Sequence, residues 1–259
     1  MKKHFFPFFS YIQYWLLQED QYSIQSPFVF EIYNGLIGYL QENQGHFLDI
    51  ESLRENLLKD TEVLEIKDFG AGSKRVPGQF RETHKIARYS SSFRKFSLLY
   101  QYFCHRTAAK NVLELGTCLG INTRYLSQAT KGNLYTLEGS ESLWRKAQEI
   151  NPPSNVKYVL GQIADTLPKL LDDIPAIDFA LIDATHTYAA TLAYFEMVLD
   201  KIQPNGILAV ADIHWSREMD QAWEKIKSNP RVQVSIDFYE CGILIFDPKL
   251  TKSHYILKY

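Results

Sequence analysis

The sequence is poor in cysteine and has no large excess of either charge. Its three cysteines, Cys104, Cys118 and Cys241, lie far apart, and none belongs to a CxxC pair. Neither a disulfide framework nor a zinc knuckle is therefore predicted, and a reducing, cytoplasmic location is favoured. The formal net charge of -2 argues against electrostatic binding of the whole chain to nucleic acid or to anionic lipid. With 46% hydrophobic and 22% charged residues among 259, the chain is typical of a globular protein with a sizeable core, and not of a disordered or fibrous one.

Long apolar runs are also absent. The most apolar stretch, residues 5–17, follows Lys2 and Lys3 but is interrupted by Pro7 and Gln13. It is too short to span a bilayer, which needs about 20 apolar residues, and no small-residue cleavage site follows it. We expect an aromatic helix that packs on the main domain, and no membrane as a partner.

The pattern of apolar residues changes near residue 110. Residues 1–109 show helical spacing, and Ser26 followed by Pro27 is a typical helix start. They are predicted to form a helical N-terminal extension or cap. Residues 110–259 alternate short apolar runs with amphipathic stretches, which predicts an α/β domain with a mostly parallel sheet. The expected parallel strands are Asn111–Leu115, Asn133–Leu137, Val156–Leu160, Ile177–Ile182 and Ile207–Ala211, and Val232–Phe238 and Gly242–Phe246 are expected to form an antiparallel hairpin at one edge.

Positive charge is concentrated in residues 71–110, which hold nine Lys and Arg against one acid, Glu82, for a local charge of +8. A solvated helix face is the simplest interpretation, and a surface for an acidic substrate or an RNA is the alternative. The turn Asp68–Ser73, DFGAGS, directly precedes Lys74 and Arg75. It is either a tight turn between helices or a site that binds an acidic acceptor through backbone amides and positive charge.

Two glycine turns compete for a nucleotide-like ligand, Asp68–Ser73 and Glu114–Gly120. The second follows an apolar run and precedes a helical stretch, and the next apolar run leads into Glu138, 24 residues after Glu114. That interval suits a βαβ unit whose second strand ends in an acid for ribose hydroxyls. Cys118 and Ile121 stand where a dinucleotide loop needs glycine, and the P-loop motif is missing from the sequence. A ligand with a ribose but without phosphates is favoured.

The segment Val112–Leu126, VLELGTCLGINTRYL, resembles the first motif of class I S-adenosylmethionine (SAM) dependent methyltransferases. Its ELGTxxG form is most similar to the small-molecule, catechol-type O-methyltransferase branch. The resemblance continues through LYTLEGS, LGQIADTLPKLL, IDFALIDATHTY and IQPNGILAVADIHW, over about residues 110–247. It implies a Rossmann-like fold with a mostly parallel seven-stranded sheet and a C-terminal antiparallel hairpin.

The resemblance also implies how SAM is bound as the cofactor. Gly116 and Gly120 would flank the methionine part, Glu138 would hold the ribose hydroxyls, and Gln162 and Ile163 would contact the adenine. The full set of expected cofactor-binding residues is Glu114, Gly116, Thr117, Gly120, Glu138, Gln162, Ile163 and Asp183.

Two polar clusters are expected at the reacting end of this site. Asp183 and His186 follow the fourth predicted strand, and Asp212 and His214 follow the fifth, so all four should meet beyond the carboxyl ends of the strands. A histidine there could remove the proton of a hydroxyl acceptor, and the aspartates could hold a divalent cation that lowers its pKa. Ile213 stands where the catechol-type enzymes have a metal-binding asparagine. A metal site on Asp183, Asp212 and His214 and a metal-free His/Asp base both remain open.

The predicted activity is thus that of a SAM-dependent methyltransferase (EC 2.1.1.-) that methylates a hydroxyl of a small-molecule acceptor. The alternatives are an RNA- or protein-directed methyltransferase, motivated by the local positive charge, and a catalytically silent SAM- or partner-binding module, motivated by Ile213 and the long extension. The asparagine-proline-proline-tyrosine tetrad of amino-methylating relatives is absent, since Asp183-Ala184-Thr185-His186 follows the fourth strand. The aromatic extension suggests a homodimer surface.

Overall fold

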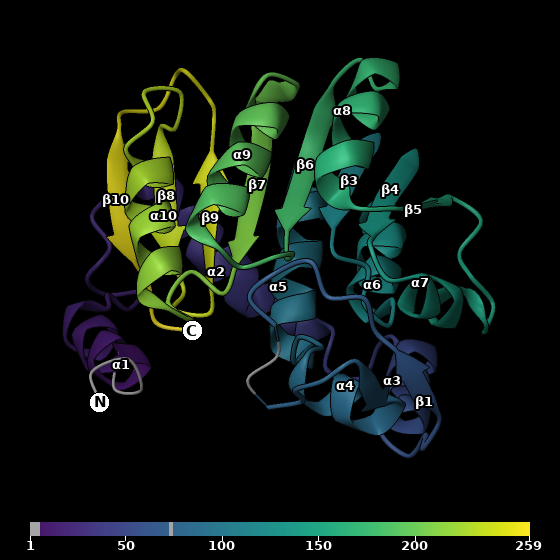
Figure 1. Ribbon diagram of the computed structural model, residues 1–259. Coiled ribbons are helices and arrows are strands. Elements are labelled where there is room, and N and C mark those ends of the chain that lie inside the picture. Colours follow the sequence, from purple (N-terminus) through teal and green to yellow (C-terminus); the bar gives the residue numbers. More distant parts are fainter. Residues whose placement is uncertain (1–5, 73–74) are drawn as a thin grey trace.

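The computed structural model describes residues 6–72 and 75–259. Its centre is an eight-stranded sheet with the strand order β10-β8-β9-β7-β6-β3-β4-β5, and helices cover both faces (Figure 1). The strands of this sheet are β3 (Asn111–Leu115), β4 (Asn133–Glu138), β5 (Val156–Leu160), β6 (Ile177–Ile182), β7 (Ile202–Ala211), β8 (Val234–Asp237), β9 (Cys241–Ile245) and β10 (Ser253–Ile256). The described helices are α1 (Phe6–Leu17), α2 (Pro27–Glu42), α3 (Leu48–Leu57), α4 (Thr83–Tyr89), α5 (Arg94–Arg106), α6 (Ile121–Ala129), α7 (Glu141–Gln148), α8 (Ile163–Asp173), α9 (Tyr188–Leu199) and α10 (Arg217–Lys227).

The predicted α/β fold is confirmed. Strands β3 to β7 are parallel, and β9 runs antiparallel to both β7 and β8. One detail differs from the expectation of seven strands with the hairpin at the edge. An eighth strand, β10, pairs in parallel with β8 and lies outside the hairpin. Its four residues are mostly half-buried, so they lack the continuous apolar run that made the inner strands recognisable.

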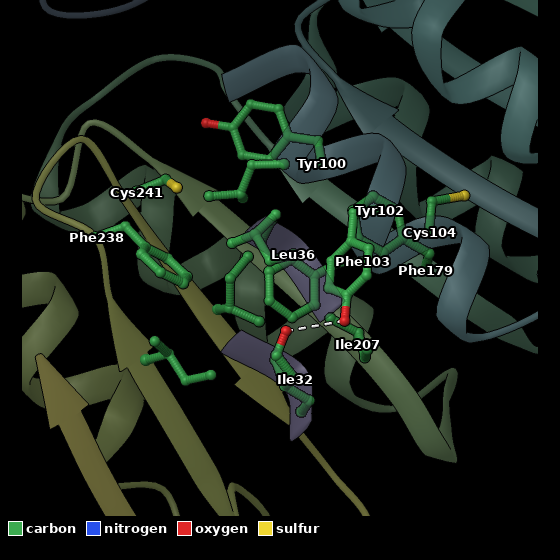
Figure 2. Close-up of a cluster of buried hydrophobic side chains, with 14 of the residues drawn as sticks. Ile32, Leu36, Tyr100, Tyr102, Phe103, Cys104, Phe179, Ile207, Phe238 and Cys241 are labelled. Atoms are coloured by element: carbon green, nitrogen blue, oxygen red, sulfur yellow. Dashed lines mark hydrogen bonds between the residues drawn. The ribbon is translucent and has the colours of Figure 1, made fainter. Parts of the chain in front are cut away.

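The extension and the sheet share one hydrophobic core. Helix α5 lies between the sheet and α2, and nine of its 13 residues are buried. Tyr102 of α5 donates a hydrogen bond to the carbonyl of Ile32 in α2 at 2.9 Å, while Phe103 packs in the same cluster as Phe179 of β6 (Figure 2). The other face of the sheet is covered by α8, α9 and α10 (Figure 1). The predicted boundary after residue 109 therefore falls inside a continuous core.

Helix α1 is attached to the C-terminal part of the chain. Tyr14, its one buried residue, donates a hydrogen bond to the carbonyl of Leu257 at 2.7 Å, and Tyr239 donates one to the carbonyl of Pro7 at 2.7 Å. Seven large apolar side chains of the helix are exposed: Phe8, Phe9, Tyr11, Ile12, Trp15, Leu16 and Leu17. Lys2 and Lys3 lie outside the described residues. Among the helices that are described, none combines the length and apolarity that crossing a bilayer requires.

The extension also contains a small two-stranded sheet, which the helical prediction did not include. Strands β1 (Val63–Glu65) and β2 (Phe80–Glu82) pair antiparallel. They are tied to the start of α7, because Ser142 donates to the carbonyl of Glu65 at 2.6 Å and Ser140 accepts from the backbone N–H of Lys67 at 3.3 Å. Residues 66–72, which follow β1 in the connection to β2, pass across the ends of the central strands (Figure 1). The connection carries the DFGAGS turn, of which Ser73 lies outside the described residues together with Lys74.

Candidate active site

A cavity of about 680 Å³ lies at the carboxyl ends of β3, β4, β6 and β7. Its floor is built by residues that follow these strands, including Gly116, Glu138, Asp183 and Asp212. Residues 66–72 and Arg75 of the connection between β1 and β2, together with the segment Ser90–Phe93, cover it from the side of the extension. This is the edge at which an open α/β sheet binds ligands.

The glycine turn after β3 is shaped by close backbone packing. Gly116 has φ 101°, and a Cβ atom there would lie 2.1 Å from the carbonyl oxygen of Asp183. The backbone N–H groups of Gly116 and Thr117 both donate to the carbonyl of Leu137, at 3.0 and 3.2 Å. Only glycine allows this approach, so the turn brings the ends of β3, β4 and β6 together.

Three of the predicted cofactor residues support this turn and do not line the cavity. Glu114 is buried and accepts hydrogen bonds from the hydroxyls of Thr123 and Thr136, at 2.5 and 2.6 Å. Burial raises its pKa to about 8, so the carboxyl is mostly neutral at pH 7. The hydroxyls of Thr117 and Thr136 lie 2.6 Å apart, and Gly120 begins α6 with φ 76°. Together they hold α6 and β4 against the turn.

Glu138 lies at the end of β4 and lines the cavity. Its carboxylate accepts from the backbone N–H groups of Cys118 and Ser140, both at 2.9 Å, which fixes its orientation. Burial raises its pKa. Ile163 also lines the cavity, whereas Gln162 is exposed at the start of α8 and does not. The turn residue Cys118 is a lining residue that the sequence prediction did not include.

The reacting end of the cavity holds Asp183, His186 and Asp212. The Nε2 atom of His186 lies 3.7 Å from a carboxylate oxygen of each aspartate. All three side chains are partly exposed toward the cavity. Burial is the main cause that raises the pKa of the Asp183 carboxyl; the neighbouring His186 opposes this rise, and the charge of Asp212 adds to it. The sequence predicted that four residues following β6 and β7 would meet here, and three of them do.

The backbone at this cluster is in a conformation that is rare for residues other than glycine. Thr185, His186 and Asp212 have φ values of 66°, 46° and 56°. Such conformations cost about 1–3 kcal/mol each and persist where surrounding contacts enforce them. One such contact comes from the DFGAGS turn, because the N–H of Ala71 donates to the carbonyl of Thr185 at 2.8 Å. A Cβ atom on Gly70 would lie 2.4 Å from that same oxygen.

His214 is not brought to this cluster. Its Nδ1 lies 2.9 Å from Asp220 and its Nε2 lies 2.7 Å from Asp237, and its ring stacks on Tyr239. These two carboxylates raise its pKa to about 9 against the opposing effect of burial. Because both ring nitrogens are occupied, His214 has no free lone pair for a proton or a metal. Ile213 is fully buried in the core, as expected of a residue that cannot be a ligand.

The donor set at the reacting end fits a divalent cation by its chemistry. Asp183, His186 and Asp212 each offer a ligand atom, and these atoms lie within 4.8 Å of one another. Two carboxylates suit a hard cation, and one imidazole shifts the preference toward Mn²⁺ or Zn²⁺. The third ligand would be His186, where the sequence pointed to His214. The same three groups equally form a histidine base flanked by two carboxylates.

Part of the positive charge of residues 71–110 is paired. Arg81 lies 2.8 Å from Asp68, Lys85 lies 3.0 Å from Glu82, and Arg106 lies 3.2 Å from Glu31. Arg75, Arg81 and Arg88 line the cavity. The local charge is therefore directed in part into the site.

One family model matches the central segment of the chain. Residues 113–213 match a family model described as a methyltransferase domain. A search of curated protein sequences finds no significant match.

Solved structures share the fold at low sequence identity. The SAH-bound methyltransferase PaMTH1 from Podospora anserina is 16% identical, with a TM-score of 0.59 over 86% of this chain and 98% of its own. The O-methyltransferase TomG from Streptomyces achromogenes, involved in tomaymycin synthesis and solved with SAM, is 18% identical, with a TM-score of 0.53 over 61% of this chain and 82% of its own. An O-methyltransferase from Bacillus cereus in complex with SAH is 20% identical, with a TM-score of 0.51 over 60% of this chain and 82% of its own. The chain therefore shares the fold of these SAM-dependent methyltransferase structures, and its residues 113–213 match the methyltransferase-domain model.

Proposed function

We propose that the protein is a SAM-dependent O-methyltransferase that acts on a small-molecule hydroxyl acceptor. The observation that carries this proposal is the position of His186 between Asp183 and Asp212, in the same cavity as the glycine turn and Glu138. Bound SAM would supply an electrophilic methyl group on its sulfonium. His186 would take the proton of the acceptor hydroxyl, and the two carboxylates would stabilise the imidazolium that forms.

The cofactor residues are proposed from the cavity and from the resemblance. Glu138 would hold the ribose hydroxyls, because its carboxylate is already oriented by two backbone N–H groups. Gly116 would let the backbone approach the methionine part, and Ile163 would contact the adenine. Asp183 would lie beside the methyl group. Glu114, Thr117 and Gly120 would act through the shape of the turn.

We propose that the base works without a metal, and that a divalent cation on Asp183, His186 and Asp212 is the alternative. Removal of divalent cations distinguishes the two mechanisms. Turnover that is unchanged after dialysis against EDTA supports the histidine base. Turnover that is lost with EDTA and restored by Mn²⁺ or Mg²⁺ shows that the three residues hold a metal.

A small acceptor is favoured over RNA or protein because the local positive charge is partly neutralised by ion pairs and partly turned into the cavity. The decisive experiment is a panel of phenolic, catecholic and carbohydrate hydroxyl acceptors, with SAH formation as the readout. Turnover of a member supports the proposal. A protein that binds SAH but turns over no small molecule, RNA or protein would be the silent binding module.

We further propose that the chain forms a homodimer through α1 and resides in the cytoplasm. Seven exposed apolar side chains on one 12-residue helix form a surface that a second copy could cover. The three cysteines are free, as in a reducing compartment. Size-exclusion chromatography with light scattering tests the dimer, and Trp15→Glu in α1 should convert it to a monomer of 30.1 kDa.

A further inference from the structure

The wall of the cavity that the extension contributes is basic. Lys67, Arg75, Arg81 and Arg88 all line it. Three of these residues come from the β1–β2 hairpin and its connection, and Arg88 comes from α4. The chain thus places several cations around the space beside the reacting cluster.

Among the described residues, three of these cations have no acidic partner. One of them is Lys67, whose ammonium lies 5.1 Å from the ring centre of Phe69; the other two are arginines. The charge of Arg81 is neutralised by Asp68 at 2.8 Å. Among the residues that the structure describes, neither Arg75 nor Arg88 forms an ion pair, and the guanidinium of Arg75 lies 5.7 Å from the ring centre of Tyr89. Both arginines line the same cavity, and Arg75 lies against Tyr89, the residue that follows Arg88 in α4. A pair of unneutralised arginines in a cavity is typical of a site for a carboxylate or a phosphate.

The reacting end of the cavity is acidic. Asp183, Asp212 and Glu240 line the cavity and come from the loops after β6, after β7 and before β9. An anionic group would be repelled from this end and attracted to the arginines. A molecule with an anionic group at one end and a neutral hydroxyl at the other would therefore be oriented with its hydroxyl toward His186.

The chain just before Arg75 is anchored beside the reacting cluster. Ala71 donates to the carbonyl of Thr185, and Gly70 packs against the same residue. The Asp68 carboxylate accepts from the N–H of Gly70 at 3.0 Å while it pairs with Arg81. The connection that carries Arg75 is therefore anchored one residue away from His186.

We propose that Arg75 and Arg88 form an anion site that selects an acceptor bearing a carboxylate or a phosphate. This inference rests on the proposed function, because it names the class of acceptor for the same cavity. The arginines are specificity-determining residues, and they take no part in the transfer of the methyl group.

The anion site is tested with inorganic phosphate as the probe. Phosphate is titrated calorimetrically into the SAH-saturated protein at constant ionic strength, for the wild type and for Arg75→Gln/Arg88→Gln. We expect binding by the wild type and an affinity at least about tenfold lower in the double variant, because each lost charge-assisted contact weakens binding markedly. Lys85→Gln is the matched control, since Lys85 is paired with Glu82 and lies outside the cavity lining. A wild type that does not bind phosphate, or a double variant that binds it equally well, would overturn the proposal.

The anion could also be the carboxylate of the cofactor, and a second comparison separates the two sources. SAH carries that carboxylate, whereas 5′-methylthioadenosine lacks it. We expect the double variant to bind both with wild-type affinity. If it loses affinity for SAH alone, the arginines bind the cofactor, and the acceptor assignment is wrong. If the wild type does not bind SAH, the proposed function fails, and phosphate titration of the unliganded protein still decides whether the anion site exists.

Discussion

At the scale of single residues, His186 and His214 differ in what their imidazole rings contact. His186 lines the cavity, 3.7 Å from two carboxylates. His214 is bonded through both nitrogens to Asp220 and Asp237. In the sequence, His186 lies four residues after a predicted strand and His214 lies three. The sequence could not distinguish them, because Asp220 and Asp237 are supplied by a helix and by a distant strand.

His186→Ala should lower kcat by about 10²- to 10⁴-fold, the usual contribution of a general base. The affinity for SAH should stay within about twofold, since the side chain would face the acceptor. Steady-state kinetics and calorimetry measure the two quantities. An equally active variant would show that His186 is not the base.

His214→Gln should destabilise the fold, because it leaves two carboxylates without their shared cation. The loss should be about 3 kcal/mol. The pKa of His214 is raised from 6.5 to about 9 in the folded state. Its contribution is therefore fully present below pH 6.5 and is lost as the pH rises through 9. Urea unfolding at pH 6 and pH 10 should show a large difference between wild type and variant at pH 6 and a small one at pH 10. A difference that does not depend on pH would contradict the charged pairing.

At the scale of elements, the glycine turn after β3 could be predicted and the role of the DFGAGS turn could not. The first depends on a local βαβ pattern, in which strand, glycines and helix follow one another along the chain. The second depends on a contact between Gly70 and Thr185, which are far apart in sequence. Strand β10 was missed for a related reason, since its pairing with β8 depends on position in the sheet more than on its own four residues.

Gly70→Ala should push the DFGAGS turn away from Thr185, because the new Cβ would start 2.4 Å from its carbonyl oxygen. We expect a drop in kcat of at least about tenfold, since small misplacements at a reacting centre are costly. Gly45→Ala is the control, because nothing lies within 4 Å of a Cβ there. Equal turnover of the two variants would show that the turn does not position the reacting loop.

At the scale of the whole molecule, the extension is part of the folded core. Helix α5 precedes residue 110, yet Leu99 and Phe103 are fully buried against the sheet and α2. A fragment of residues 110–259 would expose this surface, so we expect it to lack a cooperative unfolding transition. Thermal denaturation followed by circular dichroism measures this against the full chain. A sharp transition in the fragment would show that the predicted boundary separates two independent domains.

The central claim is that this cavity binds the SAM scaffold through Glu138. Its most direct test is calorimetric titration of the purified protein with SAH, beside NAD⁺ and with the variant Glu138→Ala. We expect saturable binding of SAH by the wild type, no binding of NAD⁺, and a loss of SAH affinity of at least about tenfold in the variant. Absence of SAH binding by the wild type would contradict the claim.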